Sequence, residues 1–244
     1  MDFAIMHGDR RQNLLCDLLI ADGHRAQILP EPDRWPRENL PPPGAILVVA
    51  KCTPILHDAA EHYGFRVLEY GQLPSFVREN GAVTAEGALQ IAMRRRLRTL
   101  RGSDVLVIGY GGIGRPLSAL LKGLGAASVS VAVRREEQLW VLKGEGYCPI
   151  LSSDLKAQAG KYDVVFNTAP ELVLTSDVLE QLRPNVLIVD LASKPGGVDW
   201  NAVQERGIKA IHALALPGQL TPVSGALAIR NAVYELCEED GYAG

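Results

Sequence analysis

The sequence lacks the features that mark secreted, zinc-binding and membrane-spanning proteins. Its four cysteines form no CxxC pair and no cysteine–histidine cluster of zinc spacing, so we expect neither a disulfide scaffold nor a metal site. No apolar run reaches the roughly 18 residues that a membrane span needs. The first residues also lack the hydrophobic run of a signal peptide. These absences predict a cytoplasmic protein with reduced thiols and no membrane partner.

An excess of positive charge is absent too. The formal net charge is −3, and the arginine run at residues 94–96 is not interleaved with aromatic side chains. Because a nucleic-acid surface needs concentrated positive charge, no nucleic-acid partner is expected. We interpret the arginine run as a solvated helix face.

Strand and helix patterns alternate along the chain. Short β-branched runs such as residues 45–50 alternate with helical patterns in the first 75 residues, with a proline-rich loop at residues 29–44. A helix is expected at residues 84–102, with Thr84 as its N-cap. A second, more regular run then follows, and its expected strands lie at residues 104–110, 128–134, 148–151, 162–169, 185–192 and 208–215.

This alternation predicts an α/β fold in which a small open unit precedes a doubly wound parallel sheet. The expected domains are an N-terminal α/β domain at residues 1–83, a linking helix at 84–101 and a Rossmann domain at 102–220. A final helix is expected at residues 221–244.

A glycine-rich turn opens the second run. Gly109, Gly111 and Gly114 have GxGxxG spacing between a buried strand and an amphipathic helix. Gly109 would make the tight turn, Gly111 would let the backbone approach a pyrophosphate, and Gly114 would allow close helix–strand packing. Gly112 and Ile113 belong to the same expected site, because the helix amino terminus faces the phosphates. The alternative is a turn of this kind that binds no nucleotide.

The end of the next strand bears on the choice between NAD and NADP. NAD-binding folds usually place an acidic residue there to bind the ribose 2′-hydroxyl, whereas this chain has Arg134 and Arg135. A guanidinium pairs bidentately with a 2′-phosphate, so NADP is predicted over NAD. Two alternatives stay open: an arginine pairs with Glu136 or Glu137, or a shifted register brings an acid into place.

Polar residues also follow a later strand. Asn167, Thr168, Ala169 and Pro170 end the strand at residues 162–169. Because ligands bind at the carboxyl ends of parallel strands, we expect these four residues beside the nicotinamide. The alternative is an ordinary turn.

The last loops supply candidate catalytic and substrate-binding groups. Lys194, with Ser193 beside it, is a candidate for holding a substrate carboxylate or for proton transfer; a solvated lysine is the alternative. His212 is a candidate acid or base, although a histidine beside an apolar strand more often packs or caps. Free N–H groups at the helix starts of Thr84 and Thr221 are expected to bind substrate carboxylates, with structural capping as the alternative.

Several stretches together resemble one family. The segments VTAEGALQIAM, VLVIGYGGIGRPLSALLKGLGA, VVFNTAP, DLASKPGGVDW and GIKAIHALALPG resemble the first of the two subunits of dipicolinate synthase over about residues 80–230. The resemblance implies two Rossmann-like units, of which the second binds NAD(P). It also implies that the final helix packs back onto a substrate-side first unit. The matched cofactor and cleft positions are Gly109, Gly111, Gly114, Arg134, Asn167, Thr168, Ser193 and Lys194.

The resemblance also implies an activity. Members oxidise a dihydrodipicolinate-type cyclic dicarboxylate to pyridine-2,6-dicarboxylate during sporulation, with NADP and a flavoprotein-like second subunit. We also expect a homo-oligomer. Two other interpretations stay open: another NAD(P)-dependent enzyme similar to 2-hydroxyacid dehydrogenases, or a nucleotide-binding assembly subunit without turnover. The first would need a His/Glu or Arg/Glu constellation, for which His212 and Glu205 are poorly spaced.

Overall fold

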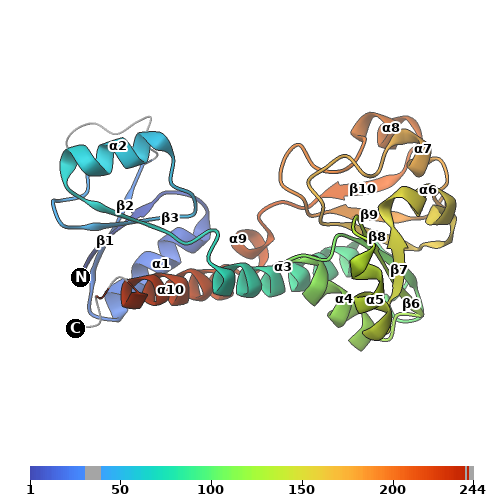
Figure 1. Ribbon diagram of the computed structural model, residues 1–244, viewed down its shortest axis with the longest axis horizontal. Coiled ribbons are helices and arrows are strands. Elements are labelled where there is room, and N and C mark those ends of the chain that lie inside the picture. Colours follow the sequence, from blue (N-terminus) through green and yellow to red (C-terminus); the bar gives the residue numbers. More distant parts are fainter. Residues whose placement is uncertain (31–39, 240, 242–244) are drawn as a thin grey trace. The chain divides into compact units, whose positions relative to one another are not determined.

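The computed structural model describes residues 1–30, 40–239 and 241, which form two compact units (Figure 1). Met1–Val83 and Pro217–Gly244 make up the first unit, and Thr84–Leu216 make up the second. Most of the predicted proline-rich loop and the last residues of the predicted final helix lie outside the described residues.

The first unit is a four-stranded parallel sheet with the order β2-β1-β3-β4. Its strands are β1 (Asp2–Met6), β2 (Arg25–Leu29), β3 (Ile46–Val49) and β4 (Arg66–Glu69), and its helices include α1 (Arg10–Ala21), α2 (Pro54–Tyr63), α9 (Leu216–Leu220, of which Leu216 belongs to the second unit) and α10 (Pro222–Glu239).

Helices cover both faces of this sheet. Because side chains alternate along each strand, neighbouring residues of β1 pack against helices on opposite faces. Phe3 and Ile5 pack in a cluster with residues of α1 and α10, such as Leu15 and Ile229. The intervening Ala4 packs in a second cluster with residues of α2.

The second unit is a six-stranded parallel sheet with the order β10-β9-β8-β5-β6-β7. Its strands are β5 (Asp104–Ile108), β6 (Ser128–Val133), β7 (Cys148–Leu151), β8 (Val164–Asn167), β9 (Leu187–Asp190) and β10 (Lys209–His212), and its helices include α4 (Gly114–Gly123), α5 (Glu137–Gly144), α6 (Leu155–Gln158), α7 (Ser176–Leu179) and α8 (Trp200–Glu205).

Apart from the partly buried Asp104, the residues of the central strands β5 and β8 are buried, which explains why these strands appear in the sequence as apolar runs. Leu106 and Ile108 of β5 pack with Tyr162 and Val178 in one core cluster, and α4 packs against β5 and β6. The predicted fold class, α/β with two Rossmann-like parallel sheets, is confirmed.

The helix expected to start at Thr84 begins ten residues earlier, so this boundary was wrong. Helix α3 runs from Pro74 to Arg95 and passes from the first unit into the second. Proline is favoured in the first turn of a helix, and Phe76 anchors that turn in the first unit's core, edge-on to Tyr70. This packing outweighs the roughly 1 kcal/mol that a glycine such as Gly81 costs inside a helix.

Two further findings bear on the class of protein. No helix among the described residues is long and apolar enough to cross a membrane. Cys16, Cys52, Cys148 and Cys237 are all free thiols.

Candidate functional site

The larger sheet reverses its strand order between β5 and β8, the point where open α/β sheets bind ligands. All six strands are parallel, so the segments that follow them emerge at one edge, the carboxyl edge. That edge carries the glycine turn after β5, the arginines after β6, and the loops after β8, β9 and β10.

The glycine turn has the backbone geometry that its spacing predicts. Gly109 has φ of +94°, a conformation that L side chains rarely adopt. A Cβ at Gly114 would collide with the carbonyl oxygen of Gly109, so α4 packs directly on the end of β5. The turn therefore brings the amino end of α4 to the carboxyl edge.

The tyrosine inside the turn points away from this edge. Tyr110 is buried, its hydroxyl donates to Glu145, and its ring lies edge-on to Tyr147. Burial and the hydrogen bond to Glu145 raise the pKa of the Tyr110 hydroxyl above its ordinary value. Tyr110 thus fastens the glycine turn to Glu145 and Tyr147.

The turn leaves room for a pyrophosphate. Among the described residues, and apart from the two chain neighbours of Gly111, no heavy atom lies within 4 Å of the position that a Cβ at Gly111 would take, so the backbone there is open to close approach. Ile113 precedes α4 and gives it no side-chain cap. In the first turn the Arg115 N–H donates to the Gly111 carbonyl and Pro116 has no N–H. Gly114 therefore supplies the first-turn N–H that can face a phosphate. This chain's residues fit a bound dinucleotide.

The loops after β8 and β9 are joined by a buried hydrogen bond. Asn167 and Asp190, the last residues of their strands, are both fully buried. The Asn167 amide donates to Asp190 Oδ1 over 2.8 Å and to the Ala169 carbonyl over 2.9 Å. Asp190 also accepts from the N–H groups of Ala192 and Gly197, both at 3.2 Å. Asn167, expected beside the nicotinamide, therefore shapes the loop that carries Ala169.

Thr168 holds the loop after β8 against the glycine turn. Its hydroxyl donates to the Ile108 carbonyl over 2.8 Å, and its N–H donates to the same oxygen over 2.9 Å. A Cβ at Gly109 would collide with Thr168 Oγ1. Of the predicted set, the structure therefore brings Gly109 and Thr168 into contact, while Pro170 is exposed.

Arg134 and Arg135 directly follow β6, and both are exposed. No shifted register places an acid at this point. Arg134 forms an ion pair with Glu171 of the loop after β8, and this partner is not one of the two glutamates considered from the sequence. The arginines predicted to bind a 2′-phosphate therefore lie at the carboxyl edge, and one of them already has a carboxylate partner.

Ser193 and Lys194 are exposed in the loop after β9. The Ser193 carbonyl accepts from the Gly196 N–H over 2.9 Å, which closes a tight turn around Lys194. This turn positions the Lys194 backbone in the loop after β9, and the Lys194 side chain is exposed.

His212, the predicted acid or base, is engaged at the end of β10. Its Nε2 donates to the Ala192 carbonyl over 2.9 Å, since a carbonyl can only accept, and its ring stacks on Trp200 with centroids 5.5 Å apart. These contacts indicate that His212 supports the loop after β9.

The two helix starts predicted to bind carboxylates differ in outcome. Thr84 lies in the middle of α3 and is buried, so no helix begins there and no free first-turn N–H groups surround it. Thr221 does directly precede α10, and its carbonyl accepts from the Gly225 N–H. Its role toward a ligand stays a prediction.

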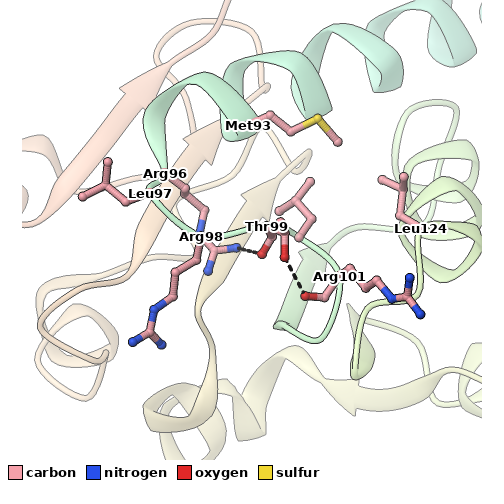
Figure 2. Close-up of a pocket in the computed structure, with 8 residues that line it drawn as sticks. Met93, Arg96, Leu97, Arg98, Thr99, Arg101 and Leu124 are labelled. Atoms are coloured by element: carbon pink, nitrogen blue, oxygen red, sulfur yellow. Dashed lines mark hydrogen bonds between the residues drawn. The ribbon is translucent and has the colours of Figure 1, made fainter.

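A hollow of about 500 Å³ lies at the opposite edge of the sheet, where α3 leads into β5 (Figure 2). Arg96 on its wall donates to the Thr99 carbonyl and to Ser103 Oγ, and Leu97 is fully exposed. The hollow lies away from the glycine turn and supplies none of the predicted site residues.

Two residues important to the site had no role assigned to them from the sequence. Asp190 was visible as an acid ending an apolar run, which signals a buried carboxylate that needs partners. Glu171 gave a weaker signal: it follows the strand that neighbours β5 in a doubly wound sheet, on the side opposite Arg134.

Residues 91–214, half of the chain, match the model of the family described as Shikimate / quinate 5-dehydrogenase. The first subunit of dipicolinate synthase from Bacillus subtilis (strain 168) is 34% identical over 160 residues, which cover 66% of this chain and 54% of that protein. Shikimate dehydrogenase (NADP(+)) of Geobacillus kaustophilus (strain HTA426) is 29% identical over 113 residues, 42% of this chain and 40% of that protein. This chain thus spans about half the length, or less, of these two relatives.

A solved structure is similar over nearly the whole chain. The crystal structure of the same dipicolinate synthase subunit from Bacillus halodurans has a TM-score of 0.84 and 23% identity, covering 96% of this chain and 97% of that one. The resemblance predicted from the sequence is confirmed by these relatives.

We expect Asp190→Asn to lower the free energy of unfolding by about 1–3 kcal/mol, because it places a donor where the buried carboxylate accepts three hydrogen bonds. Urea unfolding followed by circular dichroism measures the change. Asp58→Asn, an exposed change of the same kind, is the control and should have almost no effect. Equal stability of the two variants would contradict the role given to Asp190.

Proposed function

We propose that this chain, which belongs to the shikimate / quinate 5-dehydrogenase family, oxidises a dihydrodipicolinate-type cyclic dicarboxylate to pyridine-2,6-dicarboxylate with NADP. An oxidoreductase role follows from the family. The substrate and the preference for NADP are the proposal's own steps, and so is a place for the reaction in sporulation. The family model covers the nucleotide-binding half of the chain and does not decide the substrate.

The observation that carries the proposal is the carboxyl edge of the larger sheet. It combines an open glycine turn at Gly111 with an exposed lysine, Lys194. The loop that carries Lys194 is held by hydrogen bonds from its N–H groups to the buried Asp190. A hydride transfer needs a dinucleotide and a charged substrate held side by side. This edge offers one group for each.

The proposed roles follow from the contacts. Gly109, Gly111 and the amino end of α4 receive the pyrophosphate, and Thr168 keeps the loop after β8 against that turn. Lys194 pairs with a ring carboxylate and orients the ring. When bound, the nicotinamide accepts a hydride, and aromatisation of the ring drives the reaction.

The similarity to dipicolinate synthase supports the substrate. The Bacillus subtilis relative matches 66% of this chain, a larger share than the 42% that the shikimate dehydrogenase matches. The word "subunit" in its name supports a partner, which we propose to be a flavoprotein-like second subunit.

Arg134 and Arg135 support NADP. A guanidinium at the end of β6, the second strand of the larger sheet along the chain, suits a 2′-phosphate, whereas a carboxylate there would repel it. The relative from Geobacillus kaustophilus is named for NADP(+), which agrees with this choice.

The proposal is tested by incubating the full chain with NADP and the product of dihydrodipicolinate synthase, with and without the second subunit. We expect NADPH and pyridine-2,6-dicarboxylate to form together, measured by ultraviolet absorbance and chromatography. Shikimate and a 2-hydroxy acid serve as comparison substrates. Turnover of either comparison substrate alone would replace the proposed one. Tight NADP binding without turnover in either arrangement would favour a non-catalytic assembly subunit.

We expect Lys194→Ala to raise KM for the dicarboxylate about tenfold or more, because a charged hydrogen bond contributes about 1.5–3 kcal/mol. Steady-state kinetics at saturating NADP measures this effect. Lys143→Ala, which removes an exposed lysine of α5, should leave KM unchanged. Wild-type kinetics in Lys194→Ala would refute the contact.

We expect the double substitution Arg134→Ala and Arg135→Ala to raise the Kd for NADP about 10–100-fold, through loss of charge-assisted hydrogen bonds to the 2′-phosphate. The Kd for NAD should change far less, since NAD lacks that phosphate. Calorimetric titration of each cofactor gives both values. An unchanged ratio of the two would overturn the NADP preference.

A further inference from the structure

We propose that Glu171 is a specificity-determining residue that competes with the cofactor's 2′-phosphate for Arg134. The inference rests on the proposed NADP preference and adds to it a residue from another loop. Arg134 and Arg135 are proposed to raise the affinity for NADP, whereas Glu171 is proposed to lower it.

The ion pair has an unusual position in the sheet. Arg134 is the first residue after β6, and Glu171 lies four residues beyond the end of β8. Because β5 lies between these two strands, the pair spans the end of β5, where the glycine turn begins. Neighbouring strands are about 4.8 Å apart, so only long side chains can bridge this span.

Glu171 reaches across from a fixed support. The N–H groups of Val173 and Leu174 donate to the Gly197 carbonyl over 3.1 Å and 2.9 Å, and Leu174 forms a parallel bridge with Val198. The backbone that carries Glu171 is thereby fastened to the loop after β9. The segment that carries Glu171 is therefore held at one end by the contact of Thr168 with β5 and at the other end by the loop after β9, and its carboxylate pairs with Arg134.

The Arg134–Glu171 ion pair is weak enough for a bound phosphate to displace Glu171, yet its loss still affects the binding free energy. The two side chains are 72% and 60% exposed, and exposed ion pairs contribute little to stability. A 2′-phosphate carries more negative charge than a carboxylate and offers three acceptor oxygens. It would therefore replace Glu171 as the partner of Arg134, at the cost of the ion pair.

The two cofactors are affected differently. NAD has no 2′-phosphate, so its binding leaves Arg134 with Glu171. NADP must take Arg134 from Glu171 and must also tolerate a nearby carboxylate. Removing the Glu171 charge should therefore increase NADP affinity and leave NAD affinity almost unchanged.

The test is calorimetric binding of NADP, NAD and adenosine 2′,5′-bisphosphate to the full chain, which needs no turnover. We expect Glu171→Gln to lower the Kd for NADP and for the bisphosphate about two- to fivefold, the range that an exposed ion pair supports. The Kd for NAD should change less than the Kd for either 2′-phosphate ligand. Glu136→Gln is the matched control, because Glu136 is an exposed glutamate two residues from Arg134 with the same charge.

A second background separates this inference from the proposed function. With Arg134→Ala, the effect of Glu171→Gln should disappear if Glu171 acts through that arginine. Equal effects of Glu171→Gln and Glu136→Gln would overturn the inference in favour of general charge. If Arg134→Ala weakens NADP binding but Glu171→Gln changes nothing, only the inference fails. If Arg134→Ala has no effect either, the NADP preference fails with it.

Discussion

The buried hydrogen bond between Asn167 and Asp190 is the contact on which the site depends. Each residue ends a parallel strand, and each is completely removed from solvent. A buried carboxylate is costly unless it is hydrogen-bonded. Asp190 meets that requirement by accepting from two N–H groups of the loop after β9 and from the Asn167 amide. The requirement for partners therefore determines where the backbone of both loops goes, and with it the position of Lys194.

The carboxyl edge of the larger sheet is held by two kinds of contact. The loops after β8, β9 and β10 are tied together by buried groups, by Thr168 against β5 and by His212 against Ala192. The end of β6 is held by an exposed ion pair. A hydride transfer needs accurate positioning of the reacting groups. In the proposed function, the buried contacts hold the loops assigned to the reacting rings, and the exposed ion pair lies at the strand end assigned to the 2′-phosphate.

The sequence was sufficient where local signals agree with tertiary packing. The runs VLVI and VVFN are β-branched and apolar because both faces of β5 and β8 are covered, and the spacing of the glycines predicted the turn at Gly109. Local signals were insufficient where a distant partner decides. The start of α3 depends on Phe76 in the core of the first unit, and the role of Asn167 depends on Asp190, 23 residues later. The partner of Arg134 is 37 residues away and follows from strand order, which no short window reveals.

The Arg134–Glu171 contact also has a consequence for how relatives of this chain can diverge. Its side chains are largely exposed, so replacing either one scarcely affects the fold. Under the proposed function, substitutions at Arg134 or Glu171 would change the cofactor preference with little effect on the fold, whereas a substitution at the buried Asp190 would lower stability. Cofactor preference is thereby separable from stability in the proposed site, because the groups assigned to the 2′-phosphate lie on the surface and the groups that hold the loops lie in the core.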